Sequence, residues 1–172
     1  MTLREKYGEW GIILGATEGV GKAFCERLAK EGMNVVMVGR REEKLKELGE
    51  ELKNTYEIDY KVVKADFSLP DATDKIFAAT ENLDMGFMAY VACLHSFGKI
   101  QDTPWEKHEA MINVNVVTFM KCFYHYMKIF AAQDRGAVIN VSSMTGISSS
   151  PWNGQYGAGK AFILKMTEAV AC

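Results

Sequence analysis

Short apolar runs alternate along this chain with longer segments of helical periodicity, and this alternation restricts the possible folds more than any other feature. The run at residues 87–93 is unbroken, as in a strand that is buried on both faces. Leu45, Leu48 and Leu52 have the spacing of an amphipathic helix, with charged residues on its other face. Strands that alternate with helices indicate a parallel α/β sheet.

The pattern predicts five strands and the helices that connect them. The predicted strands are residues 10–14, 34–38, 60–65, 87–93 and 137–141. The predicted helices are residues 22–31, 42–56, 71–81 and 111–132, with a last helix from Tyr156 to the end of the sequence. Thr103 before Pro104 has the pattern of an N-cap followed by proline at the first helical position.

These elements predict a doubly wound, Rossmann-type parallel sheet with the strand order 3-2-1-4-5. A dinucleotide-binding sheet of this kind normally has two halves of three strands each, so the C-terminal strands are missing from the pattern. The last apolar helical pattern also runs to Cys172 without a cap. We therefore expect residues 1–172 to be one dinucleotide-binding domain, truncated within the helix that starts near Tyr156. A compact five-stranded domain that is complete as it stands is the alternative.

Composition excludes several classes of partner. The 172 residues carry 20 Lys and Arg against 22 Asp and Glu, a net charge of −2, so the basic excess of a nucleic-acid-binding protein is absent. The longest apolar stretch, near residues 85–94, is too short for a membrane span, and residues 1–10 lack the layout of a signal peptide. We expect a cytoplasmic protein without a metal site, because no zinc-ligand spacing occurs among Cys25, Cys93, Cys122, Cys172, His95, His108 and His125.

A glycine-rich turn, GATEGVG at residues 15–21, follows the first predicted strand. Glycines in this place allow a tight turn and let the backbone approach a pyrophosphate at the N-terminus of the next helix. A P-loop is disfavoured, because Ala16 and Ala23 stand where that motif requires a glycine and a hydroxyl. The predicted dinucleotide contacts in the turn are Gly15, Thr17, Glu18, Gly19, Val20 and Gly21.

The end of the second predicted strand indicates which dinucleotide is preferred. An acidic residue here binds the ribose hydroxyls of NAD, whereas an arginine can hold the 2′-phosphate of NADP. Residues 38–41 read VGRR, so we predict NADP(H) over NAD(H) with Arg40 as the main phosphate ligand, although Glu18 mildly opposes an anion. A solvated helix start is the alternative for Arg40 and Arg41. Further expected cofactor contacts are Asp66, for which an N-cap or turn role is equally plausible, Phe67 and Ala92.

Tyr156 and Lys160 are four residues apart at the start of the last predicted helix, so their side chains share one face. A lysine ammonium beside a phenol favours the phenolate and lowers the tyrosine pKa. Such a pair suits general acid/base catalysis. The pattern becomes more specific because residues 140–143, NVSS, precede it at the end of the fifth predicted strand.

Together with the glycine turn, these motifs resemble the short-chain dehydrogenase/reductase family across essentially the whole chain. VSSMTG at residues 141–146 resembles its catalytic serine segment, and YGAGKA at 156–161 resembles its Tyr-x-x-x-Lys motif. NVN at residues 113–115 resembles the segment with the fourth catalytic residue. Residues 7–10, 15–22 and 36–40 look most like the branch that contains hydroxysteroid dehydrogenases and ketoacyl-CoA reductases. The resemblance assigns the catalytic residues Asn115, Ser143, Tyr156 and Lys160.

The resemblance implies reversible hydride transfer between a nicotinamide and a ketone or secondary alcohol, with a steroid or another bulky apolar molecule as the candidate substrate. Tyr156 would donate the proton to the developing alkoxide, and Ser143 would polarise the carbonyl oxygen. Lys160 would bind the nicotinamide ribose and lower the tyrosine pKa. Asn115 would position a water in the proton relay to Lys160.

The sequence departs from the family pattern in three places, and two of these departures, at residues 90–93 and at the early end, favour the alternative of a non-catalytic dinucleotide-binding or scaffold protein. The family usually has Asn-Asn-Ala-Gly after its fourth strand, where residues 90–93 read YVAC. Cys93 thus places a side chain near the cofactor, and hydrogen bonds that brace the sheet are lost. Leu14 replaces a usual threonine, and the C-terminal part that supplies the substrate loop is missing.

The resemblance also predicts partners for two further regions. In the family, the helices at 111–132 and 156–172 form the subunit interface, so we expect a homodimer or homotetramer. Bulky side chains around more than one face of the first helix agree with this expectation. The loop at residues 148–152 lies between Ser143 and Tyr156, and we expect Trp152 and Leu94 to form part of a substrate wall.

Overall fold

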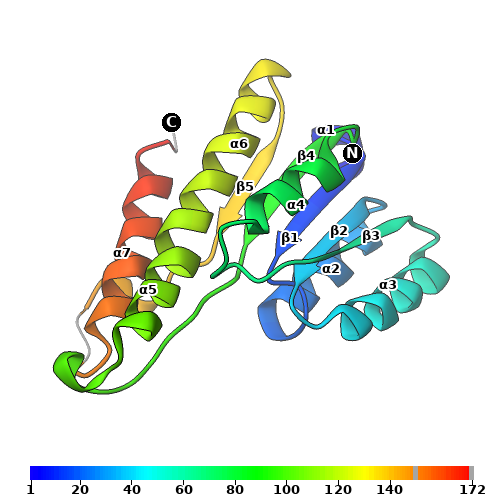
Figure 1. Cartoon of the computed structure of the whole chain (residues 1–172). Helices are drawn as coiled ribbons and strands as arrows, with labels where there is room; N and C mark the ends of the chain where they lie inside the picture. The colour runs from blue at the N-terminus through cyan, green and yellow to red at the C-terminus, as the bar shows by residue number, and fades with distance from the viewer. Residues whose placement is uncertain (149–150, 171–172) are drawn as a thin grey trace.

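A computed structural model describes residues 1–148 and 151–170 of the chain. Its centre is a sheet of five parallel strands in the order β3-β2-β1-β4-β5 (Figure 1). This order confirms the predicted Rossmann-type sheet. The strands are β1 (Trp10–Leu14), β2 (Asn34–Gly39), β3 (Tyr60–Lys64), β4 (Met85–Tyr90) and β5 (Ala137–Asn140).

Helices follow the strands in the alternation that the sequence predicts. The α-helices are α1 (Leu3–Tyr7), α2 (Gly19–Lys30), α3 (Glu42–Tyr56), α4 (Ala72–Thr80), α5 (Trp105–Ile112), α6 (Phe119–Ala132) and α7 (Gly154–Glu168). A π-helix, η2 (Asn113–Thr118), joins α5 to α6. Two short 3-10 helices, η1 (Ile100–Asp102) and η3 (Met144–Gly146), lie in the connecting segments.

The sheet lies between two layers of helices, and a hydrophobic cluster fills the space on each of its faces. On one face, Ile76 of α4, Phe119 of α6 and Ile163 of α7 pack against β-strand residues such as Val36. On the other face, α2 and α3 pack against residues such as Val35. Because neighbouring residues of a strand point to opposite faces, the apolar run of β2 serves both clusters, as in a strand buried on both sides.

The fourth strand begins and ends earlier than the predicted residues 87–93. Met85 already pairs with Trp10, so β4 starts two residues before the prediction. At its other end the amides of Val91 and Ala92 both donate to the Leu14 carbonyl, at 2.8 and 2.7 Å, and the chain leaves the sheet there. The apolar residues Val91 and Ala92 follow the strand and line the cavity that is described below.

The predicted helix 111–132 is instead a longer composite of α5, η2 and α6. It starts at Trp105, and Pro104 is its N-cap residue rather than its first helical residue. The predicted N-cap role of Thr103 is wrong, because its hydroxyl donates back to the Lys99 carbonyl at 3.1 Å. The proline still stops the helix from extending towards its N-terminus.

The ends of the described chain also differ from prediction. The helix α7 starts at Gly154 rather than Tyr156, and it ends at Glu168 with Ala169 and Val170 in a turn. The short helix α1 was not predicted. A capping box between Thr2 and Glu5 stabilises its first turn.

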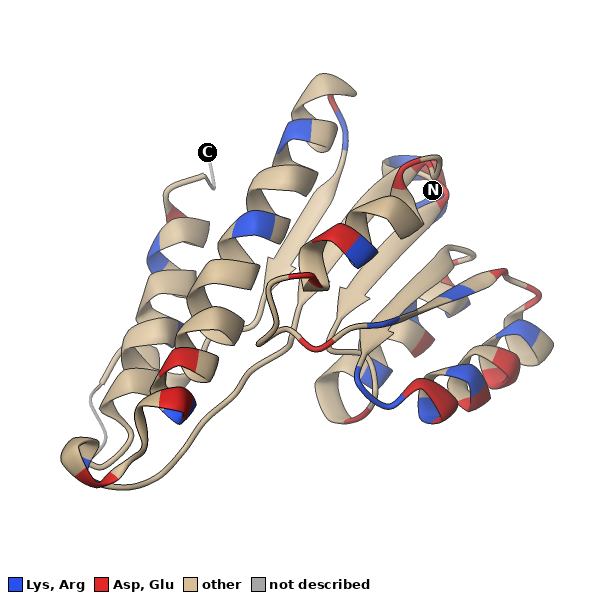
Figure 2. Cartoon of the chain, in the orientation of Figure 1, with Lys and Arg blue, Asp and Glu red and all other residues tan. Residues whose placement is uncertain are grey.

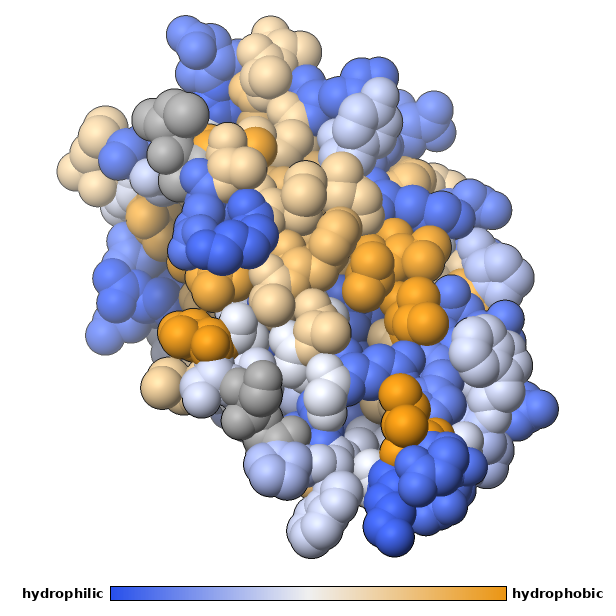
Figure 3. Space-filling view, turned by 90° about the vertical axis from the view of Figure 1, so that its left-hand side faces the viewer, coloured by the Kyte–Doolittle hydropathy of each residue, from blue (hydrophilic) through white to orange (hydrophobic). Residues whose placement is uncertain are grey.

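Charged side chains are unevenly distributed over the surface. In Figure 2 they crowd α3, whereas α6 and α7 carry few. Figure 3 looks onto the α7 side and shows apolar residues across the middle of this face, with hydrophilic residues mostly around the margin. Among the residues that the structure describes, no helix is both long and apolar enough to cross a membrane.

Candidate functional site

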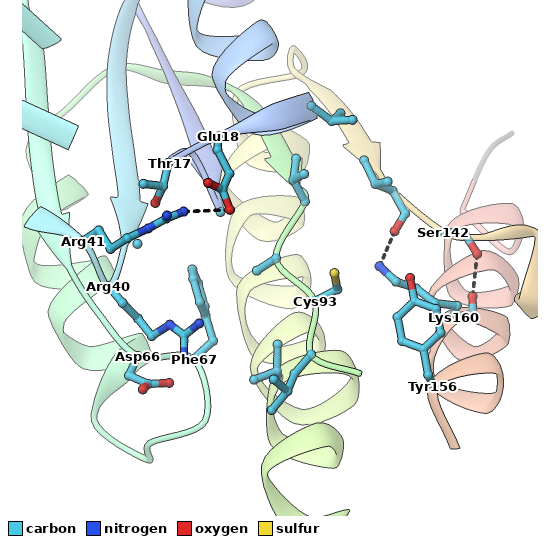
Figure 4. A pocket seen from close by; sticks show the side chains of 18 residues that line it. Thr17, Glu18, Arg40, Arg41, Asp66, Phe67, Cys93, Ser142, Tyr156 and Lys160 are labelled. Carbon is cyan, nitrogen blue, oxygen red and sulfur yellow. Dashed lines mark hydrogen bonds and ion pairs between the residues drawn. The ribbon is translucent and has the colours of Figure 1, made fainter. Parts of the chain in front are cut away.

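A cavity of about 380 Å³ opens at the carboxyl ends of the central strands (Figure 4). In an open parallel α/β sheet this is where ligands bind, at the point where the strand order reverses. Here that point lies between β1 and β4. The cavity is lined by Gly15, Thr17, Glu18, Val20, Gly39, Arg40, Arg41, Asp66, Phe67, Val91, Ala92, Cys93, Leu94, Val114, Val141, Ser142, Tyr156 and Lys160.

The glycine turn packs so closely that side chains would not fit at two of its positions. Gly15 has φ +102°, and a Cβ there would lie 2.6 Å from the Ala92 backbone nitrogen. A Cβ on Gly21 would lie 1.9 Å from the Gly15 carbonyl oxygen. Gly21 therefore acts through packing and, like Gly19, does not line the cavity.

The N-terminus of α2 opens next to this turn. Its N-cap residue, Glu18, makes no side-chain cap hydrogen bond. The amide groups of the first turn therefore lack a side-chain acceptor, and an anionic group of a ligand can take that place.

Arg40 and Arg41 stand at one end of the cavity but have different partners. Arg41 forms an ion pair with Glu18 at 2.9 Å, shown as a dashed line in Figure 4. Arg40 forms no ion pair within the described residues. Arg40, the predicted phosphate ligand, lies near the Asp66 carboxylate without forming a close ion pair with it.

Asp66 lines the cavity and also forms a local turn. Its Oδ1 accepts hydrogen bonds from the Ser68 amide and hydroxyl, at 3.0 and 2.7 Å. Burial pushes the pKa of this carboxyl up, but the Ser68 bonds and the Arg40 charge outweigh it and bring the pKa below its ordinary value. The turn role left open by the sequence is therefore present in the structure.

Tyr156 and Lys160 lie at the other end of the cavity, on one face of α7 as their spacing predicts. Lys160 is buried, and its ammonium donates to the Val141 carbonyl at 2.7 Å. Its Nζ lies 5.8 Å from the centre of the Tyr156 ring. Burial lowers the pKa of Lys160.

The expected lowering of the Tyr156 pKa is wrong for this arrangement. Partial burial raises the pKa of the phenol, the Cys93 thiol adds to the effect, and the nearby Ser143 hydroxyl only partly offsets it. The Lys160 ammonium donates to the Val141 carbonyl and not to the phenol. The phenol therefore keeps its proton at neutral pH.

The two serines after β5 differ in their contacts. The Ser142 hydroxyl lines the cavity and donates to the Lys160 carbonyl at 2.7 Å. The Ser143 oxygen accepts from the Thr145 amide and hydroxyl, at 3.2 and 2.9 Å. Ser142 thus fixes the backbone of α7, and Ser143 lies beside the Tyr156 phenol.

Asn115 lies within the π-helix η2 and is almost completely buried. Its amide group donates to the Leu94 carbonyl at 2.7 Å and accepts from the Leu94 amide at 3.1 Å. This pair of bonds joins η2 to the segment that leaves β4. Asn115 does not line the cavity, whereas its neighbour Val114 does.

Comparison with known proteins identifies the family. A sequence model described as short chain dehydrogenase matches residues 9–172. The chain belongs to this family. This chain is 83% identical over 172 residues to a 7β-hydroxysteroid dehydrogenase of Collinsella aerofaciens, and 46% identical over 171 residues to one of Clostridium sardiniense. The two matches cover 100% and 99% of this chain, but the chain spans only 65% and 66% of the length of the two relatives.

Solved structures agree with the assignment to the short-chain dehydrogenases. A 7β-hydroxysteroid dehydrogenase structure superposes with a TM-score of 0.99 at 83% identity, covering 100% of this chain and 66% of that one. A short-chain dehydrogenase from Sphingobium yanoikuyae in complex with NADPH has a TM-score of 0.89 at 24% identity, covering 94% of this chain and 64% of that one. The second likeness concerns the fold alone.

The predicted substrate wall of this short-chain dehydrogenase is divided between two cavities. Leu94 lines the cavity that holds Tyr156, but Trp152 is 67% exposed and lines a separate hollow of about 590 Å³ beside α5. Trp152 has φ +59°, a conformation that is rare for a bulky side chain. Ser149 and Ser150 of the predicted loop lie outside the described residues.

Several lining residues were absent from the predicted site. Gly39, Arg41 and Ser142 are sequence neighbours of predicted residues, so the motifs already contain their signal. Val91 and Cys93 belong to the departure at residues 90–93, which indicated a side chain near the cofactor without assigning it a contact. Only the folded chain shows that the Cys93 thiol affects Tyr156.

Proposed function

We propose that the protein is an NADP(H)-dependent 7β-hydroxysteroid dehydrogenase, which transfers a hydride between the nicotinamide and carbon 7 of a steroid. The observation that carries the proposal is one cavity that has Arg40 at one end and Tyr156 with Lys160 at the other. The names of the two curated relatives support the steroid substrate and its position of attack.

The residues of the cavity fit a nicotinamide dinucleotide. The uncapped N-terminus of α2 and the tight turn at Gly15 suit a pyrophosphate. Arg40, which forms no ion pair with any other described residue, suits the 2′-phosphate of NADP(H). When bound, the cofactor supplies or accepts the hydride. Remaining expected contacts are Thr17, Val20, Asp66, Phe67, Ala92, Tyr156 and Lys160.

The protein's own residues manage the proton. During reduction the carbonyl carbon receives the hydride pair, and the oxygen develops a negative charge. Tyr156 donates its phenolic proton to that oxygen, while Ser143 donates a hydrogen bond to it. The raised pKa of Tyr156 suits this direction because the phenol starts out protonated.

Lys160 and Asn115 support the proton donor. Lys160 is the cation nearest to the Tyr156 ring, and contact with the nicotinamide ribose is its role in the proposal. Asn115 positions the water that returns a proton through Lys160. After transfer, the phenolate is neutralised by this relay, and the site regains its starting state.

The mouth of the site offers apolar surface to a steroid body. Met144 and Ile147, which follow Ser143 in the chain, are 77% and 72% exposed, and Phe97 is 69% exposed. Leu94 lines the same cavity as Tyr156. We assign Leu94 and Trp152 to substrate contacts.

The proposal predicts that Tyr156→Phe abolishes turnover. Loss of the proton donor should lower kcat for NADPH-dependent reduction of a 7-oxo steroid by at least about 100-fold, with NADPH affinity within about threefold. The measurement is NADPH oxidation, with chromatography to establish the configuration of the product at carbon 7. Tyr124→Phe is the matched control, because Tyr124 is 59% exposed on α6, away from the cavity.

Two outcomes would contradict this function. A Tyr156→Phe protein with normal turnover would exclude the proposed proton donor. NADPH binding without turnover of any 7-oxo or 7-hydroxy steroid would instead favour a non-catalytic dinucleotide-binding or scaffold protein.

A further inference from the structure

Tyr90, the last residue of β4, has no exposed surface and does not line the cavity. Its ring packs edge-on against Phe67 and Phe119, with ring centres 6.1 and 5.2 Å apart. Burial raises the pKa of its phenol well above the ordinary value, so the hydroxyl remains a hydrogen-bond donor. A buried hydroxyl needs a partner, because desolvation of an unpaired polar group is costly.

The partner of Tyr90 lies in the π-helix η2. Its hydroxyl donates to the Val114 carbonyl at 2.6 Å. A π-helical turn departs from the α-helical hydrogen-bond register and frequently occurs at a functional site. The Tyr90 phenol therefore gives one carbonyl of this irregular turn an additional donor from a rigid, central strand.

The residue after Val114 is Asn115, which is clamped from two sides. Its side chain makes the two hydrogen bonds to Leu94 described above. On its other side, a Cβ added to Gly159 would lie 2.9 Å from the Asn115 Cβ. Gly159 precedes Lys160 directly, so the close approach of η2 to α7 occurs next to the proposed catalytic lysine.

We propose that Tyr90 is a positioning residue for the reaction: by holding the Val114 carbonyl, it keeps Asn115 in register with Leu94 and with the segment of α7 that carries Lys160. The inference rests on the proposed function, because Asn115 acts in the proton relay of that function. The inference also explains how a tyrosine can stand where the family usually has an asparagine. At this position the Tyr90 hydroxyl supplies the bracing hydrogen bond, and its acceptor lies in η2.

Tyr90→Phe removes one oxygen and leaves the ring packing in place. Small errors in the placement of a catalytic group can reduce rates strongly, so we expect kcat for the 7-oxo steroid to fall about tenfold. KM and the Kd for NADPH should stay within about threefold. The solvent deuterium isotope effect on kcat should increase, because proton return through the relay becomes rate-limiting.

The matched control is Tyr126→Phe. Tyr126 of α6 is also completely buried, and its hydroxyl forms a hydrogen bond of 3.0 Å with Thr80 of α4, outside the cavity. We expect Tyr126→Phe to lower the stability of the fold about as much as Tyr90→Phe does, without a change in kcat or in the isotope effect. Hydrogen exchange measured by mass spectrometry should become faster at residues 113–118 in Tyr90→Phe but not in Tyr126→Phe.

A double mutant tests whether Tyr90 acts through Asn115. In an Asn115→Ala background, Tyr90→Phe should reduce kcat less than twofold further, because the group that it positions is gone. A full tenfold loss in that background would overturn the inference. Unchanged kcat, isotope effect and exchange in the single Tyr90→Phe variant would also overturn it.

Failure of the proposed function would look different. A wild-type protein that binds NADPH but reduces no steroid would contradict the proposed activity. Hydrogen exchange would then still decide whether Tyr90 holds the η2 segment, since that measurement does not require turnover.

Discussion

Arg40 and Arg41 are adjacent in the sequence, but their electrostatic surroundings differ. The charge of Arg41 is paired with Glu18, whereas Arg40 forms no ion pair among the described residues. An incoming 2′-phosphate therefore gains a charge-assisted hydrogen bond from Arg40 without breaking an existing pair. Arg40 should contribute more to the binding of NADPH than Arg41 does.

Substitution of each arginine tests this difference. Arg40→Ala should weaken NADPH binding by at least about tenfold and NADH binding by less than about twofold, because NADH lacks the phosphate. Arg41→Ala, the matched control, should have the smaller effect on NADPH. Titration of nicotinamide fluorescence measures all four affinities. Equal losses for both cofactors in Arg40→Ala would remove this residue from the phosphate site.

At the residue scale, local motifs predicted much of the cavity lining. Gly15, Arg40 and Tyr156 lie within short motifs whose spacing carries their position, and all three line the cavity. The direction of the Lys160 ammonium could not be predicted in this way. It depends on the Val141 carbonyl at the end of another element, which is a tertiary contact.

At the scale of elements, long periodic segments were predicted better than irregular ones. The boundaries of α3 agree with the prediction at both ends, because its leucine spacing is regular. The π-helix η2 was not predicted, since apolar periodicity cannot distinguish a helical turn with a different hydrogen-bond register. Tertiary bonds such as that from Tyr90 to Val114 distinguish it.

An ion pair holds the start of the chain to the opposite end of the sheet from the cavity. Arg135 forms an ion pair with Asp84 and donates to the Tyr7 carbonyl. Asp84 also accepts from the Glu9 amide at 3.1 Å. Burial pushes the pKa of Asp84 up, but these hydrogen bonds and the Arg135 charge outweigh it, so the pKa is below its ordinary value.

This arrangement predicts a pH-dependent contribution to stability. Because the pKa is lower in the folded state, the stabilisation is fully present above the unfolded-state pKa, near 3.8, and is lost as pH falls through the folded-state value. Asp84→Asn should lower the free energy of unfolding by about 1 kcal/mol at neutral pH, and the difference should shrink below about pH 4.

Urea denaturation at several pH values measures this contribution. Asp59→Asn is a suitable control, because Asp59 forms an exposed 3.8 Å pair with Lys53 and should contribute less than about 0.5 kcal/mol. A difference for Asp84→Asn that stays constant from neutral pH to pH 3 would show that its charge is not responsible.

At the scale of the whole molecule, α6 and α7 lie side by side and present apolar groups on the surface (Figures 1 and 3). Tyr124 of α6 is 59% exposed, and Val117 and Ile112, which precede it in the composite helix, are 39% and 38% exposed. Exposed apolar surface of this kind marks interaction sites on soluble proteins. We propose that these helices form the interface of a homodimer or homotetramer, as the family resemblance implies.

A charge placed in this surface should weaken self-association. Sedimentation equilibrium of the chain should give a multiple of 19.2 kDa, and Tyr124→Glu should raise the dissociation constant by at least about tenfold, because a carboxylate would be buried without a partner. Tyr56→Glu is the matched control, since Tyr56 ends α3, which packs on the opposite face of the sheet. A monomeric wild-type chain would contradict the interface, and equal effects of the two substitutions would place it elsewhere.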